Sequence, residues 1–453
     1  MKNKKSKYML FALMLVIAFC TFFVSCREEQ PYKEYIPSYG DKGKELPGAY
    51  DFLSDDEKAR INEFNITNET YVYNICDFGA VSGEDCTQAI KTGIETVQKK
   101  GGGILYFPAG QYNVSEVITF SAAESVPLIL MGEPSGSFLS EIILSSKIES
   151  DAIVIASSNV SLAHLIFKSD MKTAATVCIS GEKTTLYNCK FECKANSKTS
   201  DALLKVCGSD ALLASLSFML SGDNRYTINF TKLPEVVSQN NKLIDTYIGG
   251  KVNGILIDSQ DPSSCPENIL LSRLTLLNYS NGQVDIKSVK NCTISNSMLD
   301  QGFLFCVRLD PQGTGIDNVT ISENYIAAAY KYEDKSYEKC GICIPATDTN
   351  ALVNNVTISE NMIVYSQYGI LVQNPNAKGF FVYGNSIGCD YSLHIRTSTD
   401  NVIVSNRFGE EFYIGDFSGE NIIRSNIINK LSPDCSFDDF KMDNIVTVKE
   451  VEQ

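Results

Sequence analysis

Apolar and polar residues alternate with a period of two in short runs that recur along most of the chain. The seven residues 318–324, Asn-Val-Thr-Ile-Ser-Glu-Asn, return letter for letter at 355–361. Looser copies begin at Asn159, Thr184, Ala211, Asn268, Asn291, Gly379, Asn401 and Asn421. Alternation predicts strands that bury one face, and a repeat of roughly 20 to 40 residues predicts the turns of a solenoid.

A second apolar-alternating run follows each copy and predicts a second strand in every turn. These runs cover residues 152–156, 175–179, 255–257, 284–286, 303–309, 342–344, 370–372 and 393–395. Two or three short strands per turn, joined by Asn, Gly and Ser bends, describe an all-β parallel β-helix. Such a coil accommodates 453 residues in one body because each turn buries its own layer.

The N-terminus carries an export signal. Four lysines precede an apolar run from Met9 to Val24, which predicts a secretory signal peptide over residues 1–25. Ser25 before Cys26 resembles the lipobox of bacterial lipoproteins, which implies acylation of Cys26 and a membrane partner through an N-terminal lipid anchor. We therefore expect a lipoprotein of the outer membrane or cell surface of a Gram-negative bacterium. An ordinary cleaved signal peptide is the alternative.

The rest of the chain divides into three parts. Residues 26–70 are polar and contain several prolines, which predicts a tether. Within it, the capping pattern Ser54-x-x-Glu57 predicts one short helix. Residues 71–430 hold the β-helix with its N-terminal cap, and residues 431–453, where the repeat fades, predict a C-terminal cap or tail.

The chain is acidic, with 39 Lys and Arg against 54 Asp and Glu and a net charge of −15. Loss of the leader lysines would make it four units more negative. This charge repels phosphate backbones and argues against a nucleic-acid partner. A polyanionic glycan would need calcium or a local basic patch. Apart from Cys20 and Cys26, thirteen of the 15 cysteines remain; they lack metal-binding spacing and are expected to pack in the coil, with Cys340 and Cys343 on opposite faces of a strand.

Residues 73–120 carry a specific motif. Asp-Phe-Gly-Ala at 77–80 precedes apolar residues at helical spacing, and Gly-Gly-x-x-x-Phe-Pro-Ala-Gly-x-Tyr follows at 102–112. This arrangement resembles the N-terminal cap of pectate-lyase-superfamily proteins, shared with polygalacturonase-like hydrolases. The resemblance implies a single-stranded right-handed parallel β-helix. The amphipathic helix is then expected to plug the open end of the first turn.

Outward residues of the second strand are expected to stack from turn to turn. If Ile257, Ile286 and Val307 face inward, two outward files follow. The first file holds Leu256, Asp285, Cys306, Cys343, Leu371 and His394, and the second holds Asp258, Lys287, Arg308, Pro345, Gln373 and Arg396. The groove floored by these residues and Asp310 is the predicted site. We expect Asp310, Gln373, His394 and Arg396 to bind a polysaccharide there.

Lys287 and Arg308 suggest a polysaccharide lyase. A lyase acting on a uronic-acid polymer removes the proton α to the carboxylate, and Lys287 is the candidate base with Arg308 as the acid. The pattern Lys287-Ser288-x-x-Asn291 followed by Arg308 resembles family 6 polysaccharide lyases. That resemblance implies calcium held by acidic residues before the lysine. Residues 279–282 carry no carboxylate, so calcium would rest on Asp258 and Asp285.

Two other functions stay open. A glycoside hydrolase of the polygalacturonase-like type needs paired carboxylates, for which Asp258 with Asp285, or Asp285 with Asp310, are candidates. The hydrolase motifs themselves are missing from the chain. A non-catalytic glycan-binding or surface-structural lipoprotein is the third possibility, since one solenoid serves all three functions.

Overall fold

The computed structural model describes residues 54–62, 71–121, 126–133, 140–169, 175–195, 202–278, 281–328, 339–347, 349–396, 398–415, 421–435 and 444–446. The expected leader, Cys26, most of the expected tether and most of the C-terminal tail lie outside these residues. Within the described ranges no helix is long and apolar enough to cross a membrane.

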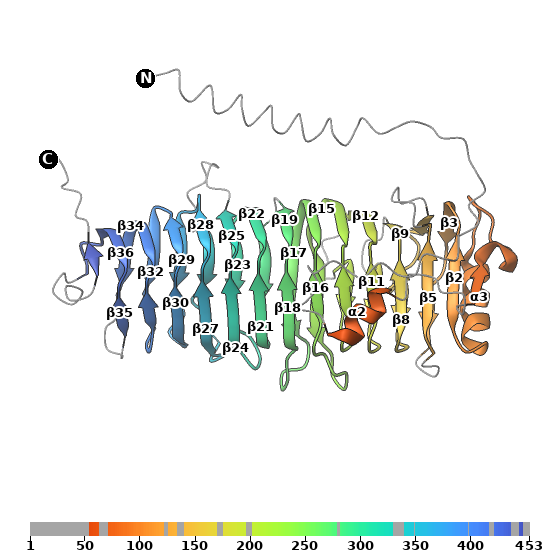
Figure 1. The fold of residues 1–453 in the computed structure, drawn as a ribbon, viewed down its shortest axis with the longest axis horizontal. Coiled ribbons are helices and arrows are strands. Elements are labelled where there is room, and N and C mark those ends of the chain that lie inside the picture. Colours follow the sequence, from red (N-terminus) through yellow and green to blue (C-terminus); the bar gives the residue numbers. More distant parts are fainter. Residues whose placement is uncertain are drawn as a thin grey trace, which may run out of the picture. The chain divides into compact units, whose positions relative to one another are not determined.

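The described residues from Tyr71 onward form a coil of parallel strands in three ladders (Figure 1). Sheet A contains β1 (Val72–Asn74), β2 (Gly103–Phe107), β5 (Leu128–Gly132), β8 (Val160–Ala163), β11 (Thr185–Tyr187), β14 (Leu212–Ala214), β16 (Lys242–Ile244), β18 (Glu267–Ser272), β21 (Val289–Ser295), β24 (Ile316–Ser322), β27 (Val353–Ser359), β30 (Ala377–Tyr383), β33 (Val402–Val404) and β35 (Ile422–Arg424).

The second sheet contains two ladders, which we call B1 and B2. Ladder B1 contains β3 (Gly110–Val114), β6 (Ser140–Leu144), β9 (Leu165–Ser169), β12 (Lys190–Ala195), β15 (Ser217–Lys232), β17 (Tyr247–Ser259), β19 (Thr275–Asn278), β22 (Met298–Gly302), β25 (Tyr325–Ala328), β28 (Met362–Val364), β31 (Ser386–Gly388), β34 (Arg407–Ile414), β36 (Ile427–Leu431) and β37 (Ile445–Val446). Ladder B2 contains β4 (Ile118–Phe120), β7 (Ile153–Ile155), β10 (Val177–Ile179), β13 (Leu204–Val206), β20 (Gly282–Ile286), β23 (Phe305–Leu309), β26 (Cys340–Ile344), β29 (Tyr368–Val372) and β32 (Tyr391–Ile395). The long strands β15, β17 and β34 run through both ladders.

The predicted parallel β-helix is confirmed. One turn runs from sheet A through B1 to B2, as in β21, β22 and β23, and each strand pairs in parallel with its counterpart in the next turn. Neighbouring turns are therefore one strand spacing apart, about 4.8 Å. Outward side chains that are far apart in sequence form continuous files.

The repeated heptad forms β24 and β27 and the bend after each strand. Asn318 and Asn355 have φ of 56° and 55°, a left-handed conformation that asparagine tolerates well. The second asparagine is buried: Asn324 Nδ2 donates to Ile294 O, and Asn361 Nδ2 donates to Ile321 O one turn later. The same ladder continues through Asn385, Asn406, Asn426 and Asn444. The repeat is therefore scaffold.

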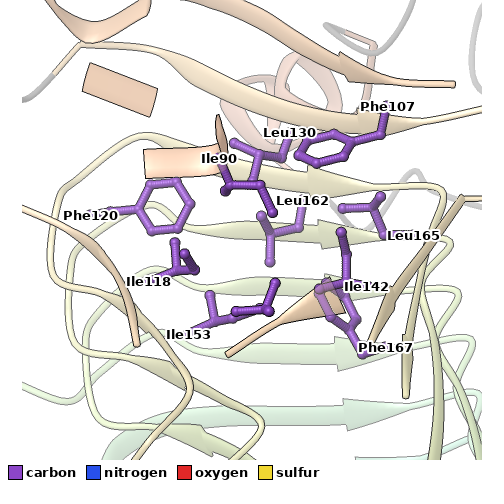
Figure 2. A pocket seen from close by; sticks show the side chains of 11 residues that line it. Ile90, Phe107, Ile118, Phe120, Leu130, Ile142, Ile153, Leu162, Leu165 and Phe167 are labelled. Atoms are coloured by element: carbon purple, nitrogen blue, oxygen red, sulfur yellow. The ribbon is translucent and has the colours of Figure 1, made fainter. Parts of the chain in front are cut away.

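Helix α3 (Thr87–Lys99) plugs the N-terminal end of the coil, as predicted. Its Ile90, Ile94 and Val97 are buried in the main core. Figure 2 shows Ile90 among side chains of the first turns that line a cavity of about 20 Å³. Every lining side chain is apolar or aromatic, so this interior space belongs to the core and offers no polar group to a ligand.

The short helix expected after Ser54 is present as α2 (Asp55–Asn62). Ser54 Oγ and N both bond the Glu57 carboxylate, as the capping pattern predicts. Glu57 also accepts from Lys242 Nζ at 2.6 Å, and Arg60 donates to Asp210 O at 2.8 Å. This helix is therefore fastened to the coil near β16.

Candidate functional site

The outer face of ladder B2 carries the predicted site residues, but in a register that differs at β23. Asp285 pairs with Arg308, and Ile286 pairs with Leu309. The prediction that Val307 stacks on Ile286, and Arg308 on Lys287, is therefore wrong by two residues. A period-two pattern is unchanged by such a shift, and Phe305 hides it because this apolar residue packs in an outer cluster.

The corrected register gives two outer files along B2. The first file contains Lys205, Asn229, Leu256, Asp285, Arg308, Cys343, Leu371, His394 and Tyr413. Backbone hydrogen bonds of the same kind order the second file, which contains Asp258, Lys287, Asp310, Gln373 and Arg396. Arg308 thus lies in the file of Asp285, where Cys306 was expected, and Asp310 takes the expected place of Arg308 next to Lys287.

Asp285 and Arg308 form a bidentate ion pair between adjacent turns. Arg308 Nε donates to Asp285 Oδ1 at 2.8 Å, and Arg308 Nη2 donates to Oδ2 at 2.6 Å. The carboxylate is 1% exposed, whereas 30% of the Arg308 side chain is exposed. The guanidinium carbon also lies 4.4 Å from the centre of the Phe305 ring. Arg308 is therefore fixed by Asp285 and Phe305, and part of its side chain is open to solvent.

Tyr226 completes this cluster from a strand that sequence reasoning did not include. Its hydroxyl donates to Asp285 Oδ2 at 2.6 Å. Burial and the charge of Asp285 raise the pKa of Tyr226, so the phenol stays protonated. Burial alone would lower the pKa of Arg308, but the hydrogen bonds and charge of Asp285 outweigh it and raise that pKa. Nothing in the sequence around Tyr226 signals this contact, because the two residues are two turns apart.

Lys287 lies beside the ion pair in the second file. It follows Asp285 by two positions, and its backbone N–H donates to Ile257 O at 2.8 Å. Its side chain and that of Arg308 are diagonal neighbours on adjacent turns, at a backbone separation of about 8 Å. Asp258 and Asp310 precede and follow Lys287 in its file. The arrangement brings two cations and three carboxylates to one patch of an acidic protein.

The predicted calcium ligands do not fit as a pair. Both oxygens of Asp285 are engaged by Arg308, and one also by Tyr226. Asp258 Oδ1 is buried without a hydrogen-bond partner among the described residues, but Lys287 follows it in the file. Within the described ranges no group of three or more His, Cys, Asp or Glu side chains is placed to hold a metal ion. Calcium stays a prediction that Asp285 does not support.

An aromatic cluster occupies the C-terminal part of the same face. Tyr368 and Tyr391 are stacked with ring centres 4.8 Å apart, and His394 and Tyr413 lie 4.4 Å apart. The His394 ring is close to perpendicular to Tyr391, at 89°. Arg396 Nε donates to His394 Nε2 at 3.3 Å. Tyr368 and Tyr391 are 23 residues apart, and so are Leu371 and His394. This equal spacing is the signal in the sequence that could have revealed the cluster.

The remaining predictions have mixed outcomes. Cys340 and Cys343 were expected on opposite faces, yet both pack in the outer cluster with Phe305. A Cβ at Gly341 would lie 2.6 Å from the buried Ile363 side chain, so position 341 faces the interior as Ile342 does, and strict alternation does not hold here. The roles of Lys287, Arg308, Asp310, Gln373, His394 and Arg396 stay predictions.

Three solved structures are similar to the chain. The tailspike protein of E. coli bacteriophage HK620 in complex with a pentasaccharide has a TM-score of 0.54 at 11% identity, covering 82% of this chain and 78% of its own. The DFA-IIIase of Arthrobacter chlorophenolicus A6 in complex with GF2 has a TM-score of 0.50 at 14% identity, covering 78% and 98%. The A-module of the Azotobacter vinelandii mannuronan C-5 epimerase AlgE6 has a TM-score of 0.48 at 18% identity, covering 74% and 99%.

No family model matches the chain, and no curated protein matches it significantly. At these identities the structural neighbours establish the fold alone. The chain is a right-handed parallel β-helix protein, in agreement with the resemblance of its N-terminal cap to the pectate-lyase superfamily.

Proposed function

We propose that the protein binds a uronic-acid-containing glycan on the outer face of B2 and cleaves it by β-elimination. The observation that carries this proposal is Arg308. Asp285 fixes two of its N–H groups, while the exposed part of the side chain faces outward. A guanidinium has five N–H donors in a planar fork, so the outer edge is prepared for a second carboxylate. A uronate supplies one.

In this proposal Lys287 acts as the base. With the uronate carboxylate on Arg308, the Lys287 amine takes the proton from the carbon next to the carboxylate. The electrons of that C–H bond form the new C=C bond as the glycosidic C–O bond breaks, and the leaving oxygen takes a proton from water. The products are an unsaturated uronate and a new reducing end.

Arg308 serves this reaction better as a carboxylate binder than as an acid. Its pKa is raised by Asp285, so proton donation from the guanidinium is unfavourable. Its fixed positive charge stabilises the negative charge that develops on the carboxylate during proton removal. We therefore assign Arg308 to charge stabilisation, which changes the role expected from the sequence.

The comparisons support a glycan as the ligand class. The HK620 tailspike is described in complex with a pentasaccharide, and it shares the coil of this chain. The basic groups on B2 also answer the objection raised by the net charge of −15. Arg308 and Lys287 supply local cationic groups to which a uronate can bind, beside the three carboxylates of the same patch.

A uronan panel tests the proposal. We expect absorbance of the unsaturated product together with new reducing ends. Lys287→Ala should lower kcat by at least about a hundredfold, as loss of a general base does. Arg308→Lys should mainly raise KM, because lysine lacks the planar fork. Lys290→Ala and Arg273→Lys are matched controls on sheet A and its flank and should leave the rates unchanged. Full activity of Lys287→Ala would overturn this assignment.

One observation favours a glycoside hydrolase as the second candidate. Asp258 and Asp310 stand two turns apart on either side of Lys287, at a backbone separation of about 10 Å. This is close to the carboxylate separation of inverting glycosidases, about 6.5 to 9.5 Å. New reducing ends without the unsaturated product would support this reading. Binding without any product would instead identify a non-catalytic glycan-binding protein.

We also propose that the protein is exported and anchored by a lipid on Cys26. The sequence Ser25-Cys26 after the apolar run supports this. Cys26→Ser should release the protein from the membrane fraction of the producing cells. Membrane association unchanged by Cys26→Ser would contradict a lipid anchor at this residue.

A further inference from the structure

We infer that the glycan site extends four turns beyond Arg308 to a distal subsite formed by Tyr391, His394 and Tyr413, so that the protein selects oligosaccharides long enough to reach it. This inference rests on the proposed function, because it takes Arg308 as the position of one uronate. It adds a requirement for substrate length.

The register sets the distance between the two ends of the site. Arg308, Cys343, Leu371, His394 and Tyr413 occupy successive turns of one file. Four turn spacings of about 4.8 Å place Tyr413 about 19 Å from Arg308. The length of one pyranose residue in an extended chain is similar to one turn spacing, so a glycan lying along the coil places about one sugar residue on each turn.

The floor between the two ends carries no charge in this file. Cys343 is 8% exposed and Leu371 is 2% exposed, and both pack in one cluster with Phe305 and Tyr368. A buried apolar floor offers contact area but no ionic recognition. Affinity for a bound chain would therefore depend on its two ends, the uronate at Arg308 and the sugar at the aromatic cluster.

The rings at the far end are fixed and partly open to solvent. Tyr391, His394 and Tyr413 are half-buried, and Tyr391 stacks on the buried Tyr368. His394 lies against Tyr413 and is perpendicular to Tyr391, while Arg396 donates to its Nε2. Rings held at a right angle form a corner of preset shape. Such a corner suits the C–H face and the edge of a pyranose, with little ordering entropy lost on binding.

Calorimetric titration with oligouronates of increasing length tests this inference on the full chain with Lys287→Ala, which prevents turnover. We expect affinity to increase with length until the oligomer spans the four turns. Tyr413→Ala should then weaken binding of the long oligomers about tenfold and leave the short ones unchanged. Tyr383→Ala is the matched control, since this tyrosine packs against Phe381 on sheet A in the same turns.

The outcomes separate this inference from the proposed function. In one outcome, oligouronates bind, Arg308→Lys weakens their binding, and Tyr391→Ala and Tyr413→Ala leave the affinity unchanged at every oligomer length. The distal subsite is then wrong and the proposed function stands. If short and long oligomers lose affinity equally in Tyr413→Ala, the length requirement is wrong. If no oligouronate of any length binds, the proposed function is wrong and this inference falls with it.

Discussion

Two ion pairs of the same chemistry join neighbouring turns of the coil in different settings. Arg308 binds Asp285 on the outer face of B2, and Arg273 binds Asp245 at the bend between sheet A and B1. In both pairs the arginine Nε and Nη2 atoms donate to the two carboxylate oxygens, at distances of 2.6 to 2.8 Å. The pairs differ in exposure, since the Asp285 side chain is 1% exposed and the Asp245 side chain is 29% exposed.

This difference shows which pair can support a binding site. Asp245 and Arg273 both adopt left-handed backbone conformations in a bend, where an exposed ion pair adds little stability. Asp285 lies in a strand, is buried, and is also bonded by Tyr226. A buried carboxylate fixes its arginine more firmly because the pair is desolvated on one side. Identical pair geometry therefore does not imply identical function.

The largest contrast is expected from removing each arginine. Arg308→Ala leaves the buried Asp285 charge without its main partner and should lower the free energy of unfolding by about 3 kcal/mol. Arg273→Ala should cost less than about 1 kcal/mol, because water replaces the lost partner of a partly exposed carboxylate. Urea denaturation followed by circular dichroism measures both values. Equal losses would show that burial does not distinguish the pairs.

A smaller effect should come from the third member of the buried cluster. Tyr226→Phe removes one donor to Asp285 and should cost about 1.5 kcal/mol, as expected when a buried acceptor loses a hydrogen bond. In a double-mutant cycle this loss should couple to Arg308→Ala, because both residues share one carboxylate. The cycle with Arg273→Ala should be additive within error. Coupling to Arg273 would contradict a local network around Asp285.

The contrast between the two pairs also marks the limit of prediction from sequence. The period-two pattern and the heptad were enough to predict the coil and the face on which Lys287, Asp285 and His394 lie, and the motif of residues 73–120 predicted the cap. The pairing of Asp285 with Arg308 was not predictable, because a shift of two residues keeps the apolar alternation and only moves Phe305 to the outer cluster. Tyr226 was missed because its neighbour in space is set by the number of residues in two intervening turns. The identity of the side chains predicts which face of the coil they occupy. The lengths of the intervening turns decide which side chains become neighbours on that face.

A third ion pair of intermediate exposure tests whether burial is the variable that matters. Burial would raise the pKa of Glu57, but the hydrogen bond and charge of Lys242 and the bonds from Ser54 lower it overall. A lowered pKa means that the pair stabilises the fold above the ordinary glutamate pKa and loses this contribution as pH falls through the folded value. Glu57→Gln should thus cost about 1 kcal/mol at neutral pH and less at an acidic pH below the ordinary glutamate pKa. Denaturation curves of both proteins at the two pH values measure this. A cost that does not change with pH would mean that Glu57 acts through packing alone.

The smallest effect is expected from salt, and it sharpens the same contrast. Exposed charges are screened when the Debye length falls from about 10 Å at 0.1 M salt to about 3 Å at 1 M, whereas buried pairs are screened much less. The cost of Arg273→Ala should therefore shrink by a few tenths of a kcal/mol over this range. The cost of Arg308→Ala should stay constant, because solvent ions do not reach Asp285. Denaturation at the two salt concentrations, with the wild-type protein measured in parallel, isolates each pair from general salt effects. A loss of the Arg308 contribution in salt would show that Asp285 is reached by solvent, and would remove the physical basis for treating Arg308 as a preset carboxylate-binding group.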